Sequence, residues 1–143
     1  MRFQSFEDAH MQLGLPGSPL YNLIVSKSGE ILSLKITDDL NSYNKILNNG
    51  NVIWYVGVGI KSATGSPIGN QNEESQLPFF SSKTYGSVFP ILRERRGMVE
   101  VMGNYRIVDI VKKISFSGFA YYHIKMYKAY DKPLLLEYKE IEL

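Results

Sequence analysis

The chain of 143 residues contains no cysteine, and it has only two histidines and one tryptophan. The lack of cysteine excludes a disulfide framework and thiolate catalysis, and it fits a reducing compartment, so we expect a cytoplasmic location. No apolar run approaches the length that crosses a bilayer, and the first residues lack the charged and then apolar pattern of a signal peptide. The sequence therefore predicts no membrane partner.

Motifs that carry catalysis or bind metals are also scarce. Neither His10 nor His123 has a carboxylate at metal-ligand spacing, and most lone histidines are structural. There is no phosphate-binding P-loop, no zinc-protease motif and no serine nucleophile elbow. The segment 57–59 begins like a dinucleotide fingerprint, but Ser62 stands where a third glycine would be needed. These absences favour a binding module over an enzyme, with no cofactor, no metal site and no catalytic residue to name.

The residues that are present indicate one globular domain. The hydrophobic fraction is 44%, and a chain of this length can bury one proper core. Runs rich in β-branched and aromatic residues predict strands at 20–25, 31–36, 52–58, 87–93, 99–101, 105–111, 119–127 and 134–143. Helical spacing predicts helices at 3–13, 38–49 and 75–85. We expect a single α+β domain over 1–143, with an N-terminal helix at about 3–13. Its core, at about 20–143, would be a curved β-sheet or open β-barrel with short flanking helices.

The charge is distributed unevenly along the chain. The net charge is +2, yet residues 1–80 hold five basic and seven acidic residues, whereas 81–128 hold nine basic and three acidic ones. Such a basic stretch favours one face that binds a polyanion, although scattered surface lysines would give the same composition. The polar loop at 60–74 is long for a small domain, and such loops are often functional.

The order of several motifs resembles that of SRA domains, the SET- and RING-associated readers of modified cytosine. Segment 55–59 resembles the Y-T-G-x-G strand and turn of that family, with Val56 in place of the threonine. The segments 69–72, 86–93, 102–108 and 117–124 then resemble, in order, its Asn-containing loop, its G-x-P-V-R-V-x-R strand, its Y-D-G-x-Y strand and its S-G-F strand. The similarity covers roughly 30–128. It implies an SRA/PUA-like fold and a partner, double-stranded DNA that carries a methylated or otherwise modified cytosine.

The resemblance also implies a mechanism and a set of pocket residues. Flipping a base out of a duplex costs a few kcal/mol, and stacking on an aromatic ring returns roughly 1–3 kcal/mol. Tyr55 matches the stacking tyrosine, and Tyr43 and Trp54 are candidates for a second wall. Adjacent strand residues point to opposite faces, so Trp54 is expected in the core. The edge of the base would be held by a carboxylate and by a backbone amide, from Asp39 or Asp38 and from Val56 or Gly57.

Contacts to the rest of the duplex would come from basic side chains and from the long loop. The predicted phosphate contacts are Lys61, Lys83, Arg93, Arg95 and Arg96. Asn70 and Gln71, in the loop, would hydrogen-bond the partner of the flipped base.

The biological setting and the ligand class stay open at this point. By analogy, the domain would be the specificity part of a modification-dependent restriction system, with a motor or nuclease domain or subunit as partner. One alternative is a PUA-like RNA-binding domain. The other is a small metal-dependent nuclease that uses Asp38, Asp39 and a lysine.

Overall fold

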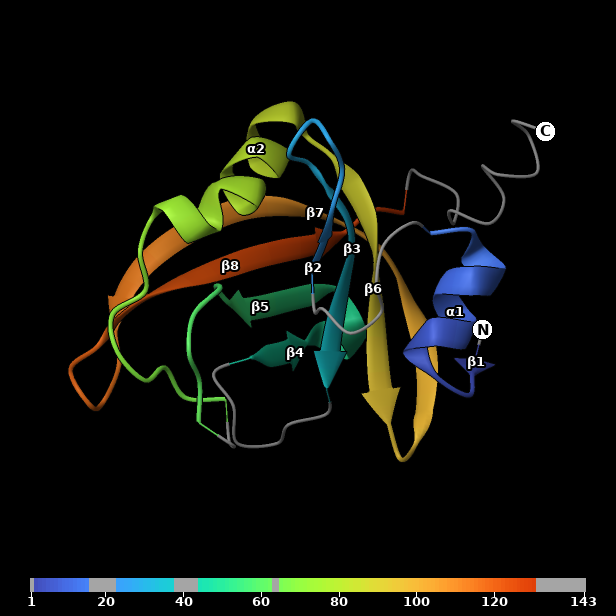
Figure 1. Cartoon of the computed structure of the whole chain (residues 1–143), viewed down its shortest axis with the longest axis horizontal. Helices are drawn as coiled ribbons and strands as arrows, with labels where there is room; N and C mark the ends of the chain where they lie inside the picture. The colour runs from blue at the N-terminus through green and yellow to red at the C-terminus, as the bar shows by residue number, and fades with distance from the viewer. Residues whose placement is uncertain (1, 16–22, 38–43, 63–64, 131–143) are drawn as a thin grey trace. The chain divides into compact units, whose positions relative to one another are not determined.

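The computed structural model describes residues 2–15, 23–37, 44–62 and 65–130. Its elements, in chain order, are β1 (Arg2–Phe3), α1 (Phe6–Leu13), β2 (Leu23–Val25), β3 (Ile31–Thr37), β4 (Lys45–Leu47), η1 (Asn48–Gly50), β5 (Val52–Val56), η2 (Glu74–Gln76), α2 (Leu77–Tyr85), β6 (Val88–Arg95), β7 (Met98–Ile114) and β8 (Ala120–Lys128). Within the described ranges, the strands pair in the order β2-β3-β6-β7-β8-β5-β4, and β1 pairs with β7. The path ends at β2 and β4, so these strands form an open sheet and no closed barrel (Figure 1). The predicted α+β class is confirmed.

The chain divides into two compact units, and each is built from separate segments. Unit 1 comprises Met1–Asp38, Val88–Tyr105 and Ala129–Leu143, and unit 2 comprises Asp39–Ser87 and Arg106–Lys128. Strand β7 therefore contributes its first half to unit 1 and its second half to unit 2.

Unit 1 is organised around α1. Ser5 caps this helix by accepting a hydrogen bond from the Asp8 N–H at 3.0 Å, and Gly14 ends it in the left-handed conformation with φ 67°. The helix buries Phe6, Ala9 and Leu13 in a cluster with Phe3, Leu92 and Val99. The predicted N-terminal helix is thus confirmed, and the cap at Ser5 explains why it starts later than residue 3.

The remaining strands of unit 1 follow the predicted pattern. Strands β2 and β3 correspond to the strands predicted at 20–25 and 31–36, and they pair antiparallel, with Leu23 opposite Leu34. Strand β3 then pairs in parallel with β6, where Leu34 lies opposite Ile91 and both side chains are fully buried. The apolar run at the start of β6 is explained by this position between β3 and β7.

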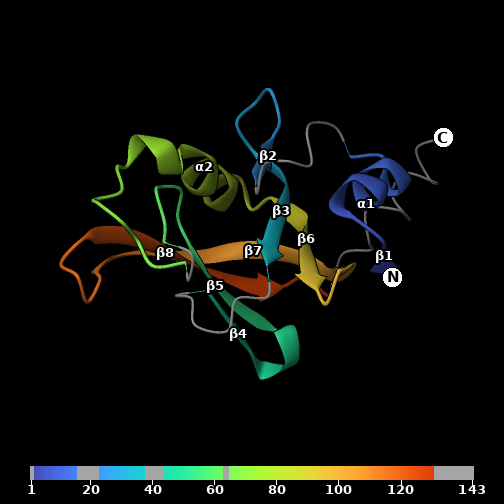
Figure 2. The same ribbon diagram turned by 60° about the horizontal axis from the view of Figure 1, so that its bottom comes forward.

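In unit 2, α2 packs beside strands β5 and β8 (Figure 2). Strand β5 pairs antiparallel with β8, with Tyr55 opposite Ile124. The helix packs its aromatic residues on these strands, because the Phe79 and Tyr55 ring centroids lie 6.0 Å apart and those of Phe80 and Tyr122 lie 6.2 Å apart. The predicted helix at 75–85 is confirmed.

Two predicted elements differ from the structure. The helix expected at 38–49 is wrong over its described part, because Lys45–Leu47 is strand β4, which gains its hydrogen bonds from β5. The break expected between the predicted strands 99–101 and 105–111 is also wrong, because β7 runs through Gly103 and Asn104. Gly103 has φ 135°, which a glycine adopts without strain, so the strand continues. Residues 38–43 and the predicted strand at 134–143 lie outside the described residues.

Candidate nucleic-acid site

The predicted stacking residue Tyr55 lies in unit 2, on the face of β5 that carries the core. Its side chain is only 4% exposed and its ring packs on Phe79. The ammonium group of Lys61 lies over the same ring, 5.4 Å from the ring centroid. In this conformation the Tyr55 ring is therefore covered, and the group over it belongs to a long, flexible side chain.

Lys61 points inward, although the sequence predicted a contact to a phosphate. Its Nζ donates a hydrogen bond to the Val56 carbonyl oxygen at 3.3 Å. Burial lowers the pKa of Lys61 from its ordinary value of 10.5, because a charged ammonium loses hydration there. The structure thus places this cation beside Tyr55.

The backbone amides expected to hold the base edge already have partners. The Val56 N–H donates to Asn44 Oδ1 at 2.7 Å, and the Gly57 N–H donates to the Tyr122 carbonyl at 2.8 Å. The Val56 side chain is 1% exposed. Neither amide is available to a base in this conformation, and Asn44 is a residue that sequence reasoning missed.

Two buried glutamines hold the turn that follows β5. Gln76 is fully buried; its Oε1 accepts from the Val58 N–H at 2.8 Å and its Nε2 donates to the Val58 carbonyl at 2.8 Å. Gln71 donates from Nε2 to the Gly57 carbonyl and accepts at Oε1 from the Tyr122 N–H, each at 2.9 Å. The expectation that Gln71 faces a partner base is wrong, since its amide is buried and bonded to backbone. Sequence reasoning missed Gln76.

The two glycines of the motif make room for these glutamines. A Cβ at Gly57 would lie 3.0 Å from Gln71 Oε1 and closer still to Gln76 Oε1. A Cβ at Gly59 would lie 2.8 Å from Gln71 Cγ. Neither glycine is among the residues with positive φ, so the requirement is steric. The Gly-x-Gly pattern is therefore explained by close side-chain approach.

The opposite face of β5 carries a cluster of cations around Trp54. The Trp54 ring centroid lies 4.6 Å from that of His123, 4.6 Å from Lys113 Nζ and 5.5 Å from Lys125 Nζ. Trp54 is half-buried, so the expectation of a core position is wrong. The opposite orientations of Trp54 and Tyr55 are as the strand pleat predicts.

The other predicted residues are spread over both units. Asn70 is exposed in unit 2, and its Oδ1 accepts from the Ala120 N–H at 2.8 Å. Lys83 is exposed on α2. Arg95 and Arg96 are exposed in unit 1, where Arg93 is half-buried on β6. The structure brings together Tyr55, Val56, Gly57, Lys61 and Gln71, whereas Asp38, Asp39 and Tyr43 lie outside the described residues.

Neither a metal-ligand cluster nor a membrane-spanning helix occurs among the described residues. In those parts of the chain, no three histidine or carboxylate side chains are placed to hold a metal ion. Likewise, none of the described helices is long and apolar enough to cross a membrane.

Comparison with solved structures identifies the fold. The chain superposes on KRYPTONITE in complex with mCHH DNA, an H3(1–15) peptide and SAH, with a TM-score of 0.74 and 18% identity over 94% of this chain and 32% of that one. It superposes on the SUVH5 SRA domain bound to fully hydroxymethylated CG DNA with a TM-score of 0.72 and 17% identity, over 92% of this chain and 89% of that one. SUVH9 matches with a TM-score of 0.66 and 22% identity, over 96% of this chain and 29% of that one.

These likenesses give the chain an SRA-like fold, as the resemblance predicted. The chain spans nearly all of the isolated SUVH5 SRA domain but only about a third of KRYPTONITE, where it covers 32%. No protein-family model and no curated protein matches the sequence.

Proposed function

We propose that this chain is a binding module for double-stranded DNA that carries a modified cytosine, and that it takes the flipped base against Tyr55. The observation that carries the proposal is the match over 92% of the chain to SUVH5 SRA structures, whose DNA is hemimethylated, fully methylated or hydroxymethylated. The strand and turn at 55–59 support the same proposal, since they match the family motif that contains the stacking tyrosine.

Access to Tyr55 requires that Lys61 move. The ring is 4% exposed, and the ammonium over it is the group that a stacked base would replace. Burying an ammonium is unfavourable, as its lowered pKa reflects, so release of Lys61 toward water offsets part of the cost of opening. Once released, the charge lies near the flipped nucleotide and neutralises one of its phosphates. Lys61 is then both the cover of the empty site and a contact in the filled one.

Recognition of the modification rests on shape in this proposal. Val56 replaces the threonine of the family, so no side-chain hydroxyl contacts the base at that position. A buried methyl group contributes about 0.8 kcal/mol, which is less than the stacking energy of roughly 1–3 kcal/mol. We therefore expect a moderate preference for methylated over plain DNA, on top of strong, salt-dependent binding to phosphates. Asp39 or Asp38 remains the proposed acceptor for the cytosine amino group.

Replacing Tyr55 with alanine tests the base site. We expect the affinity for a methylated duplex to fall by more than tenfold, because stacking is lost, and the preference over a plain duplex to disappear. Binding is measured by titration with matched methylated, hemimethylated and unmodified duplexes at one salt concentration. Equal affinity of the wild-type protein for methylated and plain DNA would sink the proposed function.

The control for Tyr55→Ala is Phe79→Ala. Phe79 is fully buried and packs on the Tyr55 ring, so its removal weakens the same part of the core and leaves the tyrosine in place. The base is assigned to Tyr55 if Tyr55→Ala binds methylated and plain duplexes equally well while Phe79→Ala still prefers the methylated duplex. An unchanged ratio in a folded Tyr55→Ala protein removes Tyr55 from the site.

The same titrations separate the other candidate functions. Tighter binding to structured RNA than to any duplex would favour a PUA-like RNA-binding domain. Magnesium-dependent cleavage that is lost in Asp39→Ala would favour a nuclease. By analogy, we also propose that the domain is the specificity part of a modification-dependent restriction system, with a motor or nuclease domain or subunit as partner.

A further inference from the structure

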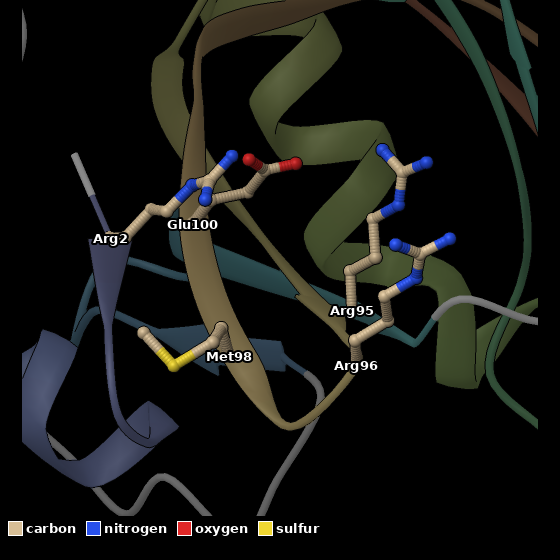
Figure 3. A pocket seen from close by; sticks show the side chains of 5 residues that line it. All are labelled: Arg2, Arg95, Arg96, Met98 and Glu100. Carbon is tan, nitrogen blue, oxygen red and sulfur yellow. The ribbon is translucent and has the colours of Figure 1, made fainter.

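Unit 1 contains a cavity that is lined mainly by arginines. Its lining residues are Arg2, Arg95, Arg96, Met98 and Glu100, and its volume is about 320 Å³. Figure 3 shows Arg95 and Arg96 extending side by side from the β6–β7 hairpin, with Arg2 and Glu100 close to each other on β1 and β7. The volume is at the small end of the range found for small-molecule sites.

The strand pleat fixes which side chains face this cavity. Strand β1 pairs with β7 so that Arg2 lies opposite Glu100 and Phe3 opposite Val99. Phe3 and Val99 are buried in the cluster under α1, at 6% and 2% exposure. Successive strand residues point to opposite faces, so Arg2, Met98 and Glu100 share the other face. The cavity therefore lies on the face of β1 and β7 opposite the buried cluster under α1.

The charge of the lining favours an anionic ligand. Three arginines and one glutamate line the cavity, which gives its lining a formal charge of +2. Guanidinium groups bind phosphate oxygens through paired, charge-assisted hydrogen bonds. Met98 is 41% exposed and offers an apolar surface beside them, suited to a sugar or a base.

The turn at the hairpin tip holds an arginine in an unfavourable backbone conformation. Arg96 has φ 53° and Gly97 has φ 75°, so both residues of this two-residue turn are left-handed. Glycine and asparagine adopt this conformation more readily than arginine does. Strain of this kind is common at functional sites, and here it places a guanidinium group at the cavity.

We propose that this cavity is a phosphate-binding site for which Arg2, Arg95 and Arg96 supply the hydrogen-bond donors. The ligand is a phosphate group of a nucleic-acid strand, and this assignment rests on the proposed function. A free nucleotide carries the same chemistry, and the experiment therefore includes both sources.

The sharpest variant is Arg96→Gly, because glycine suits a φ of 53° better than arginine does. We expect the variant to be at least as stable as the wild type in chemical denaturation and to bind plain and methylated duplexes roughly three- to tenfold more weakly. Arg2→Gln should lower the affinity for both duplexes by a similar factor. The slope of log affinity against log salt should become shallower by about one for each phosphate that the variant no longer neutralises. The control is Lys27→Gln, which removes an exposed charge of unit 1 outside the cavity.

Two further titrations identify the source of the phosphate. Binding of deoxycytidine monophosphate and inorganic phosphate that is weakened in Arg96→Gly and Arg2→Gln, with duplex affinity unchanged, assigns the cavity to a free phosphate. Duplex, nucleotide and phosphate affinities that all equal those of Lys27→Gln overturn the proposal. The outcome is separate from that of the proposed function, because plain DNA suffices here. If the wild-type protein shows no preference for methylated over plain DNA, the proposed base site fails, but the phosphate site is still tested by plain DNA.

Discussion

At the scale of single residues, His10 shows how a lone histidine serves the core. It is 5% exposed on α1, and its Nε2 lies 3.3 Å from Ser33 Oγ. Its Nδ1 is buried and has no hydrogen-bond partner among the described residues. Burial, and next the charge of Lys35, lower the pKa of His10 below 6.5. The structural role expected for this histidine agrees with these contacts.

We predict that the free energy of unfolding falls in acid because of His10. The unfolded chain takes up a proton near pH 6.5, whereas the folded chain takes it up only at the lower, folded pKa. Stability is therefore lost as pH falls from 6.5 through that folded pKa. Urea denaturation at about pH 7.5 and about pH 5.5 measures the loss. His10→Gln keeps a donor toward Ser33 and does not titrate, so its loss should be smaller. Equal losses in both proteins would contradict the prediction.

The residues of the candidate site were only partly predictable. Tyr55 and the two glycines followed from the motif, because they are adjacent in the chain. Gln71 was predicted to hydrogen-bond the partner of the flipped base, yet its partners are the backbone of Gly57 and of Tyr122. The sequence alone does not show which distant backbone group a polar side chain will hydrogen-bond. For the same reason, the sequence did not single out Asn44 and Gln76, which bond to the backbone of Val56 and Val58.

At the scale of elements, the turn at 57–59 depends on Gln76 filling the space left by Gly57. We predict that Gly57→Ala lowers the free energy of unfolding by about 1–3 kcal/mol, through overpacking. Gln76→Ala should cost about 1–3 kcal/mol, because it leaves the Val58 N–H and carbonyl without their partner. In the double variant the added methyl group gains the space of the removed Gln76 amide, although its 3.0 Å approach to Gln71 Oε1 remains. The combined loss should therefore be smaller than the sum by roughly 0.5–3 kcal/mol.

Chemical denaturation of the wild type, both single variants and the double variant measures this coupling. Gly69→Ala is the matched control, because a Cβ there meets nothing within 4 Å and its penalty comes from a φ of +87°. Its effect should add to that of Gln76→Ala without coupling. Strict additivity in the Gly57 and Gln76 pair would show that the two residues do not share one space.

The elements that were predicted correctly are those in which apolar residues recur at regular spacing within the element itself. Helix α1, the β2–β3 hairpin and strands β5 and β8 have regular apolar spacing and clear ends. Strand β4 has only three residues, and it forms by pairing with β5. No local sequence pattern therefore predicts it. Gly103-Asn104 has the composition of a turn, but pairing on both sides of it keeps β7 extended.

At the scale of the whole molecule, the order of weak motifs predicted the fold better than any single motif did. The structural neighbours share only 17–22% identity with the chain, yet they match more than 90% of it. A fold is specified by many positions that need only the right polarity and size. A ligand site depends on a few exact side chains, and Val56, which stands where the family motif has threonine, is a position at which this chain differs.

The alkaline limit of stability should be set in part by Tyr105. This residue is fully buried, and burial, together with the nearby Tyr130, raises the pKa of Tyr105 to about 12. The unfolded chain loses this proton near pH 10.0, so the contribution of Tyr105 to stability is complete below pH 10.0 and is lost as pH rises through about 12. Lys61 acts in the opposite direction in alkali, because its folded pKa lies below 10.5.

Comparison with Tyr105→Phe isolates the tyrosine, since both proteins retain Lys61. We predict that the free energy of unfolding of the wild type falls more than that of Tyr105→Phe between about pH 9 and about pH 11. Denaturation followed by circular dichroism at these two pH values measures the difference. Parallel losses in the two proteins would mean that other groups set the alkaline limit. A wild type that gains stability relative to Tyr105→Phe would reverse the sign derived from the buried phenol.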